Sequence, residues 1–224
     1  MCGRFAQQRP ASELAEIFDA EPLVPDEVPR FNIAPTNDAM VVVAKDERRA
    51  VTAYRWGLIP HWADSRSIGQ RMINARAETV ASSAAFRDSF RRRRCLVPVD
   101  AFYEWRREGS VRLPYVIRRE DGAPLALAGL WSGWRDPETE EVVRTFTIVT
   151  TTANELVESI HDRMPVIVPP ERWATWLDPQ LEDAGELSGL LVPADPLGLE
   201  VYEVSRKVNS VRNDGPDLLT PLPG

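Results

Sequence analysis

The chain has 224 residues, of which 43% are hydrophobic and 27% charged, as in an ordinary globular domain with a sizeable core. No apolar run approaches the roughly 18 residues that span a bilayer, the N-terminus has no apolar signal segment, and the two cysteines lie in no Cys/His cluster. A membrane protein, a secreted disulfide scaffold and a metal site are therefore not expected, and the expected location is cytoplasmic.

The net charge of −7 weighs against a nucleic-acid partner, but the charge is unevenly distributed. Residues 86–119 hold ten arginines and four acidic residues, whereas residues 120–203 hold four arginines and seventeen acidic residues. Because association follows the local field, a basic face is compatible with an acidic protein. Charge alone favours ordinary surface ion pairs for these arginines, and it neither establishes DNA binding nor excludes it.

The first half of the chain predicts one helix, two strands and some helical turns. Leu14 and Phe18 recur at helical spacing, and Ser12 is placed to cap the helix that they define. Proline-rich sequence then leads into the first strand. The expected elements are a helix over 11–18, strands over 39–43 and 53–58, and helical turns over 74–82 and 83–90.

The second half is rich in β-branched and aromatic segments separated by turn signals. The expected elements are strands over 95–99, 101–105, 115–118, 125–130, 145–150 and 201–204, and helices over 152–159 and 171–177. This order predicts an α+β fold, a compact single domain with a curved, barrel-like, mostly antiparallel sheet flanked by helices. The domain is expected to span residues 1–224, with the last ten or so residues as a tail.

Cys2 is a candidate nucleophile. Removal of the initiator methionine would leave it with a free α-amine, whose reference pKa of about 7.7–8.0 keeps much more of it neutral near pH 7 than a lysine amine. Such an amine condenses with an aldehyde, and the thiol on the same residue can then close a five-membered thiazolidine. Position alone favours the other interpretation, a small residue near a terminus, because many proteins begin Met-Cys by chance.

Three further segments carry candidate acid–base or orienting groups. His161 follows an expected helix and can shuttle protons, or it can be a structural histidine; His61, between Pro60 and Trp62, is interpreted as structural. Alternation along the expected strand puts Phe102, Glu104 and Arg106 on one face and Tyr103 and Trp105 on the other. Glu104 is therefore either a desolvated carboxyl group with a raised pKa or the ion-pair partner of Arg106 or of another arginine in residues 86–119.

The segment that begins at Asn74 supplies an amide, a cation and a carboxylate in five residues. Asn74 can orient a substrate and Arg76 can bind a phosphate, or Asn74 is a helix N-cap and Arg76 is a surface residue. Trp62 and Trp105 can stack on bases, although most of the seven tryptophans are expected in the core. No GxGxxG, P-loop, HExxH or GxSxG pattern is present.

Seven segments together resemble the SOS-response-associated peptidase (SRAP) family, the abasic-site-processing proteins. They are MCGRF at 1–5, NIAPT at 32–36, WGLIPHWA at 56–63, INARAET at 73–79, FYEW at 102–105, IHDRMPV at 160–166 and VSRKVN at 204–209. They follow the family's order over nearly the whole chain. Thr36 departs from the pattern, since other members often carry glycine there.

The resemblance implies capture of abasic sites in single-stranded DNA as a thiazolidine on Cys2, in a compact barrel-like fold. Carried over by motif, Asn74 positions the amine or sugar, Glu104 assists ring opening and proton transfer, and His161 is an acid–base. The implied DNA contacts are Arg4, Arg76 and Arg163 with phosphates and Trp62, Trp105 and Thr150 along the DNA path. A monomer with no cofactor and no metal is expected.

Two other functions fit the same residues. A thiol peptidase would use Cys2 with a nearby histidine and glutamate, and removal of Met1 by the protein itself is its minimal form. A binding module for single-stranded DNA would use the arginines and tryptophans and not Cys2. The three hypotheses differ in whether a covalent DNA adduct forms and whether it depends on Cys2.

Overall fold

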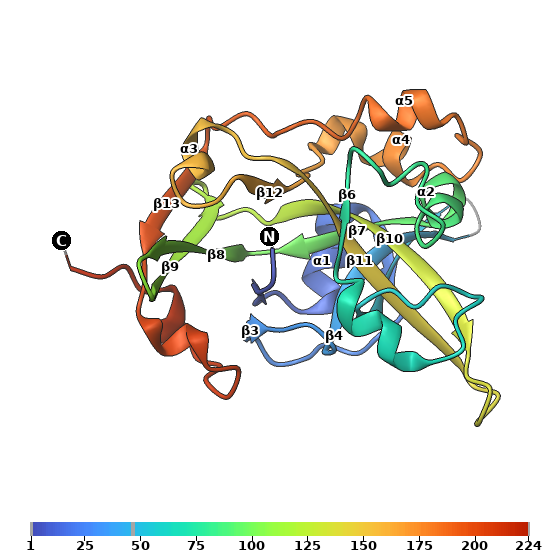
Figure 1. The fold of residues 1–224 in the computed structure, drawn as a ribbon, viewed down its shortest axis with the longest axis horizontal. Helices are drawn as coiled ribbons and strands as arrows, with labels where there is room; N and C mark the ends of the chain where they lie inside the picture. Colours follow the sequence, from blue (N-terminus) through green and yellow to red (C-terminus); the bar gives the residue numbers. More distant parts are fainter. Residues whose placement is uncertain (1, 46–47, 224) are drawn as a thin grey trace.

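Five strands close into a barrel in the computed structural model, which describes residues 2–45 and 48–223 (Figure 1). The barrel strands are β4 (Asp38–Lys45), β5 (Arg48–Trp56), β7 (Arg94–Val99), β10 (Leu125–Arg135) and β11 (Val142–Thr152). They pair antiparallel in the order β5-β4-β7-β10-β11. The parallel pairing of β11 with β5, at Thr145 opposite Arg55, closes the ring.

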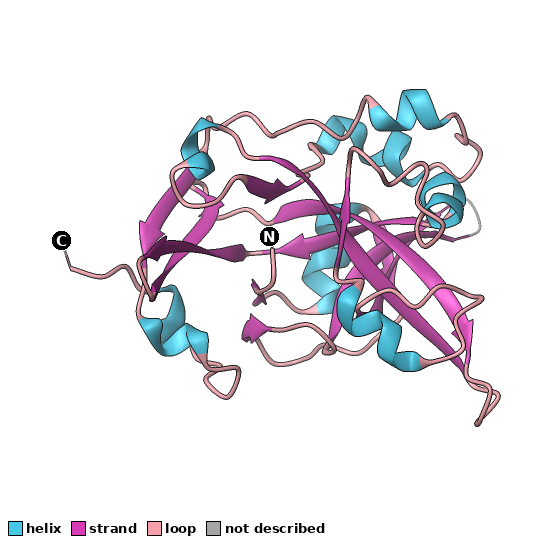
Figure 2. Cartoon of the chain, viewed as in Figure 1, coloured by secondary structure: helices cyan, strands magenta, loops and turns pink. Residues whose placement is uncertain are grey.

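A second, antiparallel sheet packs with the barrel and carries the N-terminal segment (Figure 2). In order, its strands are β13 (Leu199–Glu203), β9 (Val111–Arg119), β8 (Ala101–Glu108), β1 (Phe5–Gln7) and β3 (Arg30–Ile33). Three short strands join the barrel, β2 (Ala20–Pro22) on β5, and β6 (Asn74–Arg76) and β12 (Arg163–Pro165) on β11.

Short helices lie around the barrel and beside the second sheet (Figure 2). The α-helices are α1 (Ala11–Phe18), α2 (Arg87–Arg92), α3 (Glu155–Glu158), α4 (Trp173–Leu177) and α5 (Ala184–Ser188), and the 3-10 helices are η1 (Arg66–Arg71), η2 (Pro170–Arg172), η3 (Arg206–Asn209) and η4 (Pro216–Leu219). Alternate residues of the barrel strands face two different cores. Val42 packs with α1 and α4 residues, whereas Val41 and Val43 pack with Phe5 and Phe102 of the second sheet. The predicted α+β fold with a barrel-like, mostly antiparallel sheet is confirmed.

Two local predictions need correction. The helical turns expected over 74–82 begin later, because Asn74–Arg76 is a strand that pairs with β11; turns follow it, in which the N–H of Val80 donates to the carbonyl of Arg76 at 2.9 Å. Pairing with the barrel buries Ala75 completely, which outweighs the local helical pattern. Ser12 does not cap α1, whose N-cap is Pro10; the Ser12 hydroxyl instead donates to Asp26 at 2.9 Å.

Other segments differ in extent from their predictions. The helical turns expected over 83–90 are present and lead into α2, and the helix expected over 152–159 is limited to α3, because β11 continues to Thr152. The C-terminal residues expected as a tail include η4, whose Leu218 is fully buried with Val204 and Val208. The backbone of Leu222 also donates to the carbonyl of Glu203.

The loop between β3 and β4 turns through a left-handed residue at Thr36, with φ of 75°. A β-branched residue is strained there because its side chain crowds the backbone, whereas glycine is not. The backbone N–H of Thr36 donates to Trp56 at 2.9 Å, which holds this turn against the barrel. The difference from the family pattern at Thr36 therefore has a conformational consequence.

Candidate functional site

The register of β1 against β8 brings Cys2 next to Glu104. Phe5 lies opposite Phe102, and the N–H of Tyr103 donates to the carbonyl of Arg4 at 3.0 Å. Two residues further along the same antiparallel register, the segment before Arg4 lies opposite Glu104. Both side chains are buried, Cys2 completely and Glu104 with 1% of its surface exposed.

Burial gives this pair its chemical character. Burial, followed by the negative charge of Glu104, raises the pKa of the Cys2 thiol, so the sulfur is held as a thiol near neutral pH. Burial also raises the pKa of Glu104 to about 7, where a carboxyl group both gives and takes protons. Arg106 pairs with Glu108 at 2.7 Å, which supports the desolvated Glu104 and not the alternative Glu104–Arg106 pair.

Asn74 fixes the backbone of the candidate nucleophile. Its side-chain N–H donates to the carbonyl oxygen of Cys2 at 2.9 Å, across 72 positions of sequence. The pairing of Asn74 with Ile148 of β11 sets this orientation. Asn74 is therefore not a helix N-cap, and its side chain holds the backbone of Cys2.

His161 lies in the turn between α3 and β12. The backbone N–H of Arg163 donates to His161 Nδ1 at 3.0 Å, and the Asp162 carboxylate lies 2.9 Å from the same nitrogen. Nδ1 cannot accept the first bond and carry a proton for the second, and burial lowers the pKa of His161, so the neutral ring with its proton on Nε2 is favoured. The negative charge of Asp162 adds to the raised pKa of Glu104, so this turn lies near the Cys2 site.

Arg4 and Trp105 lie together on the other side of the N-terminal segment. The Arg4 guanidinium is 5.8 Å from the Trp105 ring centroid and donates to Asn32 Oδ1 at 2.7 Å and to the carbonyl of Val208 at 2.9 Å. The Trp105 indole N–H donates to Asn209 Oδ1 at 2.7 Å. The family-like segments at 32–36 and 204–209 thus hold Arg4 and Trp105, two of the expected DNA contacts, in place.

Arg76 and Arg163, two of the expected phosphate contacts, lie close to Glu78. Arg163 donates to both carboxylate oxygens of Glu78, at 2.7 and 3.0 Å, and to the carbonyl of Thr150 at 2.6 Å. The hydrogen bond from Arg163 holds the pKa of Glu78 below its usual range, with the charge of Arg76 adding to it. Arg76 itself is exposed.

Thr150 was expected to line the path of the DNA on the surface, and its position does not fit that role. It is fully buried in β11, so its side chain does not line a surface path and instead supports Arg163. Trp62, by contrast, is 51% exposed and available for stacking, and His61 beside it is exposed and not a buried structural residue.

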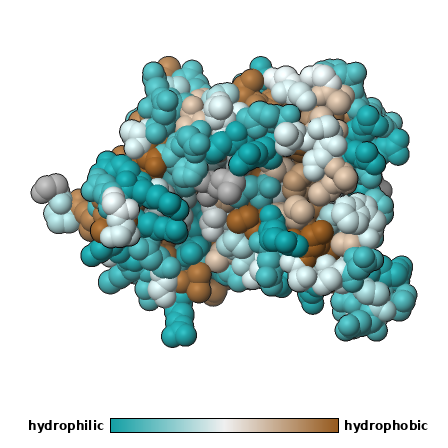
Figure 3. Space-filling view, viewed as in Figure 1, coloured by the Kyte–Doolittle hydropathy of each residue, from teal (hydrophilic) through white to brown (hydrophobic). Residues whose placement is uncertain are grey.

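In the described residues no group of three or more His, Cys, Asp or Glu side chains is arranged to hold a metal ion. No helix in the same ranges is long and apolar enough to cross a membrane. Hydrophilic side chains cover most of the face shown in the space-filling view, and apolar ones form small separate patches (Figure 3).

Comparison with known proteins decides the family. A family model described as SOS response associated peptidase (SRAP) matches residues 1–211. The chain belongs to the SRAP family. The family expected from the seven segments is confirmed.

Curated relatives of SRAP type match along the whole chain. The chain is 39% identical over 222 residues to "Abasic site processing protein YoqW" of Bacillus subtilis (strain 168), covering 98% of this chain and 99% of that protein. It is 32% identical over 230 residues to "Abasic site processing protein YedK" of Escherichia coli (strain K12), covering 99% and 100%. The match to "Abasic site processing protein HMCES" of Gallus gallus is 31% over 225 residues, covering 87% and 66%.

A solved structure shares the architecture. A protein from Bacteroides thetaiotaomicron superposes with a TM-score of 0.89 at 28% identity, covering 99% of this chain and 100% of that one.

Sequence reasoning missed two asparagines of this SRAP site. Asn32 accepts from Arg4 and donates to the carbonyls of Ser210 and Asn213, so it ties the N-terminal segment to the C-terminal one. Asn209 holds Trp105. Both residues lie inside quoted family-like segments, which was the available signal, but only the fold shows what they touch.

Proposed function

We propose that this protein captures abasic sites in single-stranded DNA as a thiazolidine on Cys2. The α-amine of Cys2, freed by removal of Met1, adds to the aldehyde carbon of the opened sugar, and the adduct loses water to give an imine. The thiol sulfur then adds to the imine carbon, and the thiol proton passes to the imine nitrogen. One water leaves overall, and no oxidant, metal or cofactor is consumed. Met1 itself lies outside the described residues.

The observation that carries the proposal is the burial of Cys2 beside Glu104 with its carbonyl held by Asn74. A buried thiol with a raised pKa is a poor thiolate, so the amine is the better first nucleophile. The thiol reacts second, when the imine carbon is already within the same residue's reach. This order distinguishes aldehyde capture from thiolate attack.

The neighbours of Cys2 have separate roles in the proposed reaction. Glu104, with a pKa of about 7, moves protons during sugar opening and imine formation. His161 serves as a second acid–base through Nε2. Asn74 positions the amine by fixing the Cys2 backbone.

The proposed DNA path uses the residues around this centre. Arg4, Arg76 and Arg163 bind phosphates, and Trp62 and Trp105 stack on bases next to the lesion. Arg163 reaches a phosphate from its present contact with Glu78, and Thr150 supports it from behind. One protein molecule suffices for one lesion, so we propose a monomer acting in the cytoplasm on damaged DNA.

The test is a crosslinking assay with a single-stranded oligonucleotide that carries one abasic site. The intact protein mass first establishes that Met1 is absent. Wild type is expected to give a heat-stable adduct one water lighter than its two components, and Cys2→Ala is expected to give none. Cys95→Ala is the matched control, because Cys95 is the other free, fully buried cysteine. An equally stable adduct with Cys2→Ala would refute the mechanism.

Two further outcomes identify the alternatives. Cleavage of peptides at a rate unaffected by abasic DNA would support the thiol peptidase that the family description records. Retention of intact single strands without any covalent product would support a simple binding module. The raised pKa of the Cys2 thiol disfavours the first of these.

A further inference from the structure

Two adjoining polar hollows lie beside η1, away from the Cys2 site. The first, about 340 Å³, includes Arg55, Arg66 and Arg144 among its lining residues. The second, about 320 Å³, shares Arg55 and Arg66 and adds the side chains of Ser65, Ser67 and Gln70. The two hollows share Arg55 and Arg66 in their lining and are together called here the arginine groove.

The three arginines come from three different elements, β5, η1 and β11. The parallel pairing that closes the barrel sets Arg55 opposite Thr145, the neighbour of Arg144, so closure of the barrel itself brings these two together. Arg66 and Arg144 are exposed and Arg55 is half-buried.

None of the three forms an ion pair within the described ranges. Arg9, Arg92, Arg118 and Arg163 each have a carboxylate within 3 Å, whereas other exposed arginines, among them Arg48, Arg91 and Arg172, also have no ion pair in the described residues. What distinguishes Arg55, Arg66 and Arg144 is that all three line one hollow. Like charges that share a hollow repel one another unless an anion joins them. The arginine groove is therefore arranged for an anionic ligand from outside the chain.

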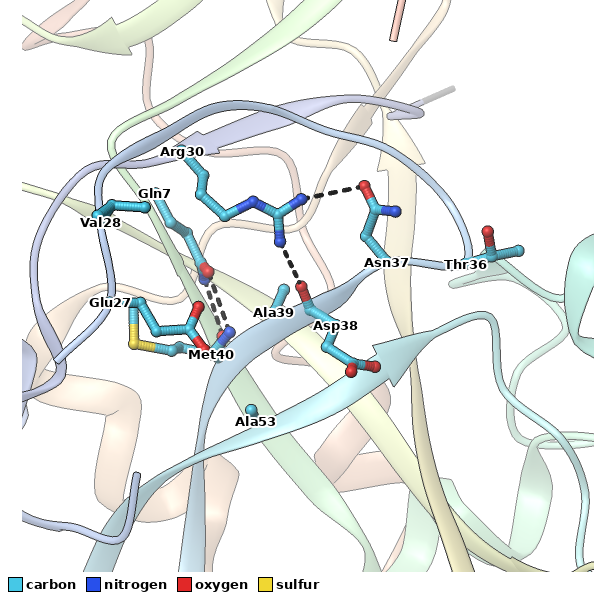
Figure 4. Close-up of a pocket in the computed structure, with 10 residues that line it drawn as sticks. All are labelled: Gln7, Glu27, Val28, Arg30, Thr36, Asn37, Asp38, Ala39, Met40 and Ala53. Atoms are coloured by element: carbon cyan, nitrogen blue, oxygen red, sulfur yellow. Dashed lines mark hydrogen bonds between the residues drawn. The ribbon is translucent and has the colours of Figure 1, made fainter. Parts of the chain in front are cut away.

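One carboxylate, that of Asp38, also borders the arginine groove. The view of the neighbouring hollow shows Arg30 bound to the side chain of Asn37 and the backbone carbonyl of Asp38, while the Asp38 carboxylate points away from Arg30 (Figure 4). A single carboxylate against three guanidinium groups leaves the arginine groove positive.

A rigid cluster connects the arginine groove to the proposed DNA path. Ile59, Ala63 and Trp134 form a small core, against which Ile68 of η1 and Val143 of β11 pack. The Trp134 indole N–H donates to the carbonyl of Ala63 at 2.7 Å, which fixes the loop that carries Trp62. The loop that carries Trp62, the helix η1 and the strand β11 therefore all pack on this cluster, and Met72 and Ile73 connect η1 to Asn74.

We propose that Arg55, Arg66 and Arg144 bind backbone phosphates of the single strand that flanks the abasic nucleotide. This inference rests on the proposed function, since it extends the DNA path beyond the lesion. Guanidinium groups bind phosphate oxygens in a bidentate manner, and serine hydroxyls and the glutamine amide add neutral donors. The contacts read the backbone, so binding here is independent of base sequence.

The test measures binding of lesion-free single-stranded DNA by fluorescence anisotropy over a series of salt concentrations. The variant R55Q/R66Q/R144Q is compared with R48Q/R91Q/R172Q, which removes the same charge from three exposed arginines elsewhere on the surface. Each phosphate contact on a single strand contributes about 0.7 to the slope of log K against log salt, so the groove variant loses about 2. The control variant retains the wild-type slope.

Strand length gives a second measurement. Wild type gains affinity when a short strand is extended by roughly ten nucleotides on each side, a reach comparable with single-strand site sizes. The groove variant loses this gain. The single variant Arg144→Gln, at an exposed position, reduces the slope by about 0.7 and guards against misfolding of the triple variant.

An unchanged slope in the groove variant, or equal losses in groove and control variants, overturns the proposal. Crosslinking of the short abasic strand is measured in parallel. If wild type forms no adduct, the proposed function fails while the salt slopes still test the groove. If the groove variant forms the adduct normally but keeps the wild-type slope, the groove alone fails.

Discussion

The buried carboxyl group of Glu104 makes stability depend on pH in a direction opposite to that of most carboxylates. Glu104 is 1% exposed, and burial raises its pKa from 4.5 to about 7. The folded protein therefore holds a proton on Glu104 at pH values where the unfolded chain has lost it. Replacement of Glu104 by glutamine keeps the shape of the side chain and removes the ionisation.

The sign and size follow from proton linkage. Between pH 4.5 and 7 the folded state binds one more proton at Glu104 than the unfolded state, so the free energy of unfolding falls as pH rises. Each pH unit corresponds to about 1.4 kcal/mol, which gives a loss of about 3 kcal/mol that is complete above pH 7. Glu104→Gln avoids this loss and is expected to be more stable than wild type by about 3 kcal/mol at pH 8, or roughly 6–12 °C in Tm.

The assay is urea unfolding of wild type and Glu104→Gln at several pH values from 4.5 to 8.5. Only the difference between the two proteins is used, because the other titrating groups cancel in it. The matched control is Glu138→Gln, which removes an exposed carboxylate between β10 and β11 and is expected to give no comparable trend. A difference that stays constant with pH, or that grows toward acid, would refute the reasoning.

Three more predictions concern the substitution of single residues. Thr36→Gly relieves the strain at φ of 75° and is expected to raise Tm by about 2–4 °C, corresponding to about 1 kcal/mol; a lower Tm in calorimetry contradicts it. Arg94→Met removes donors to five backbone carbonyls at the ends of α2 and around α4, and is expected to cost about 3 kcal/mol in urea unfolding. Asn74→Ala removes the hydrogen bond to Cys2 and is expected to slow adduct formation up to about tenfold with the same final yield. A rate equal to that of wild type would show that Asn74 does not orient the nucleophile.

Local patterns were sufficient for much of the fold. The spacing of Leu14 and Phe18 gave the bounds of α1, because an amphipathic helix needs only its own residues to define its buried face. The alternation along β8 also predicted its two faces, with Phe102 in the barrel core and Tyr103 in a separate cluster. These predictions depend on near neighbours in sequence.

The incorrect predictions depend on pairings between distant segments. Asn74 looked like the start of a helix, but its neighbour Ala75 pairs with Val149 across more than seventy positions. Burial of Thr150 followed from the same pairing and was not visible in its own segment. No local signal indicates that β5 and β11 close the barrel in parallel.

For the candidate site, too, local sequence patterns predicted some features, and others depend on contacts between distant segments. The residue types of Cys2, Glu104 and His161 suggested their chemistry, and the desolvation of Glu104 was one of two interpretations that the pattern left open. The contact of Arg163 with Glu78 and the support of Arg4 by Asn32 required the fold, because charge counts do not say which arginines already have partners.

Burial determines the proton chemistry of Cys2 and Glu104 and also lowers the stability of the fold. A solvent-exposed Cys2 would ionise more readily and favour attack by sulfur, whereas the buried residue keeps its proton and, in the proposed reaction, leaves the first step to the amine. The same burial sets Glu104 near neutrality, where it can serve that amine, and it destabilises the fold by the amount that Glu104→Gln would restore. A variant that gains stability at pH 8 and loses the adduct would therefore be a single consequence of one desolvated carboxyl group, and a variant that shows only one of these effects would separate them.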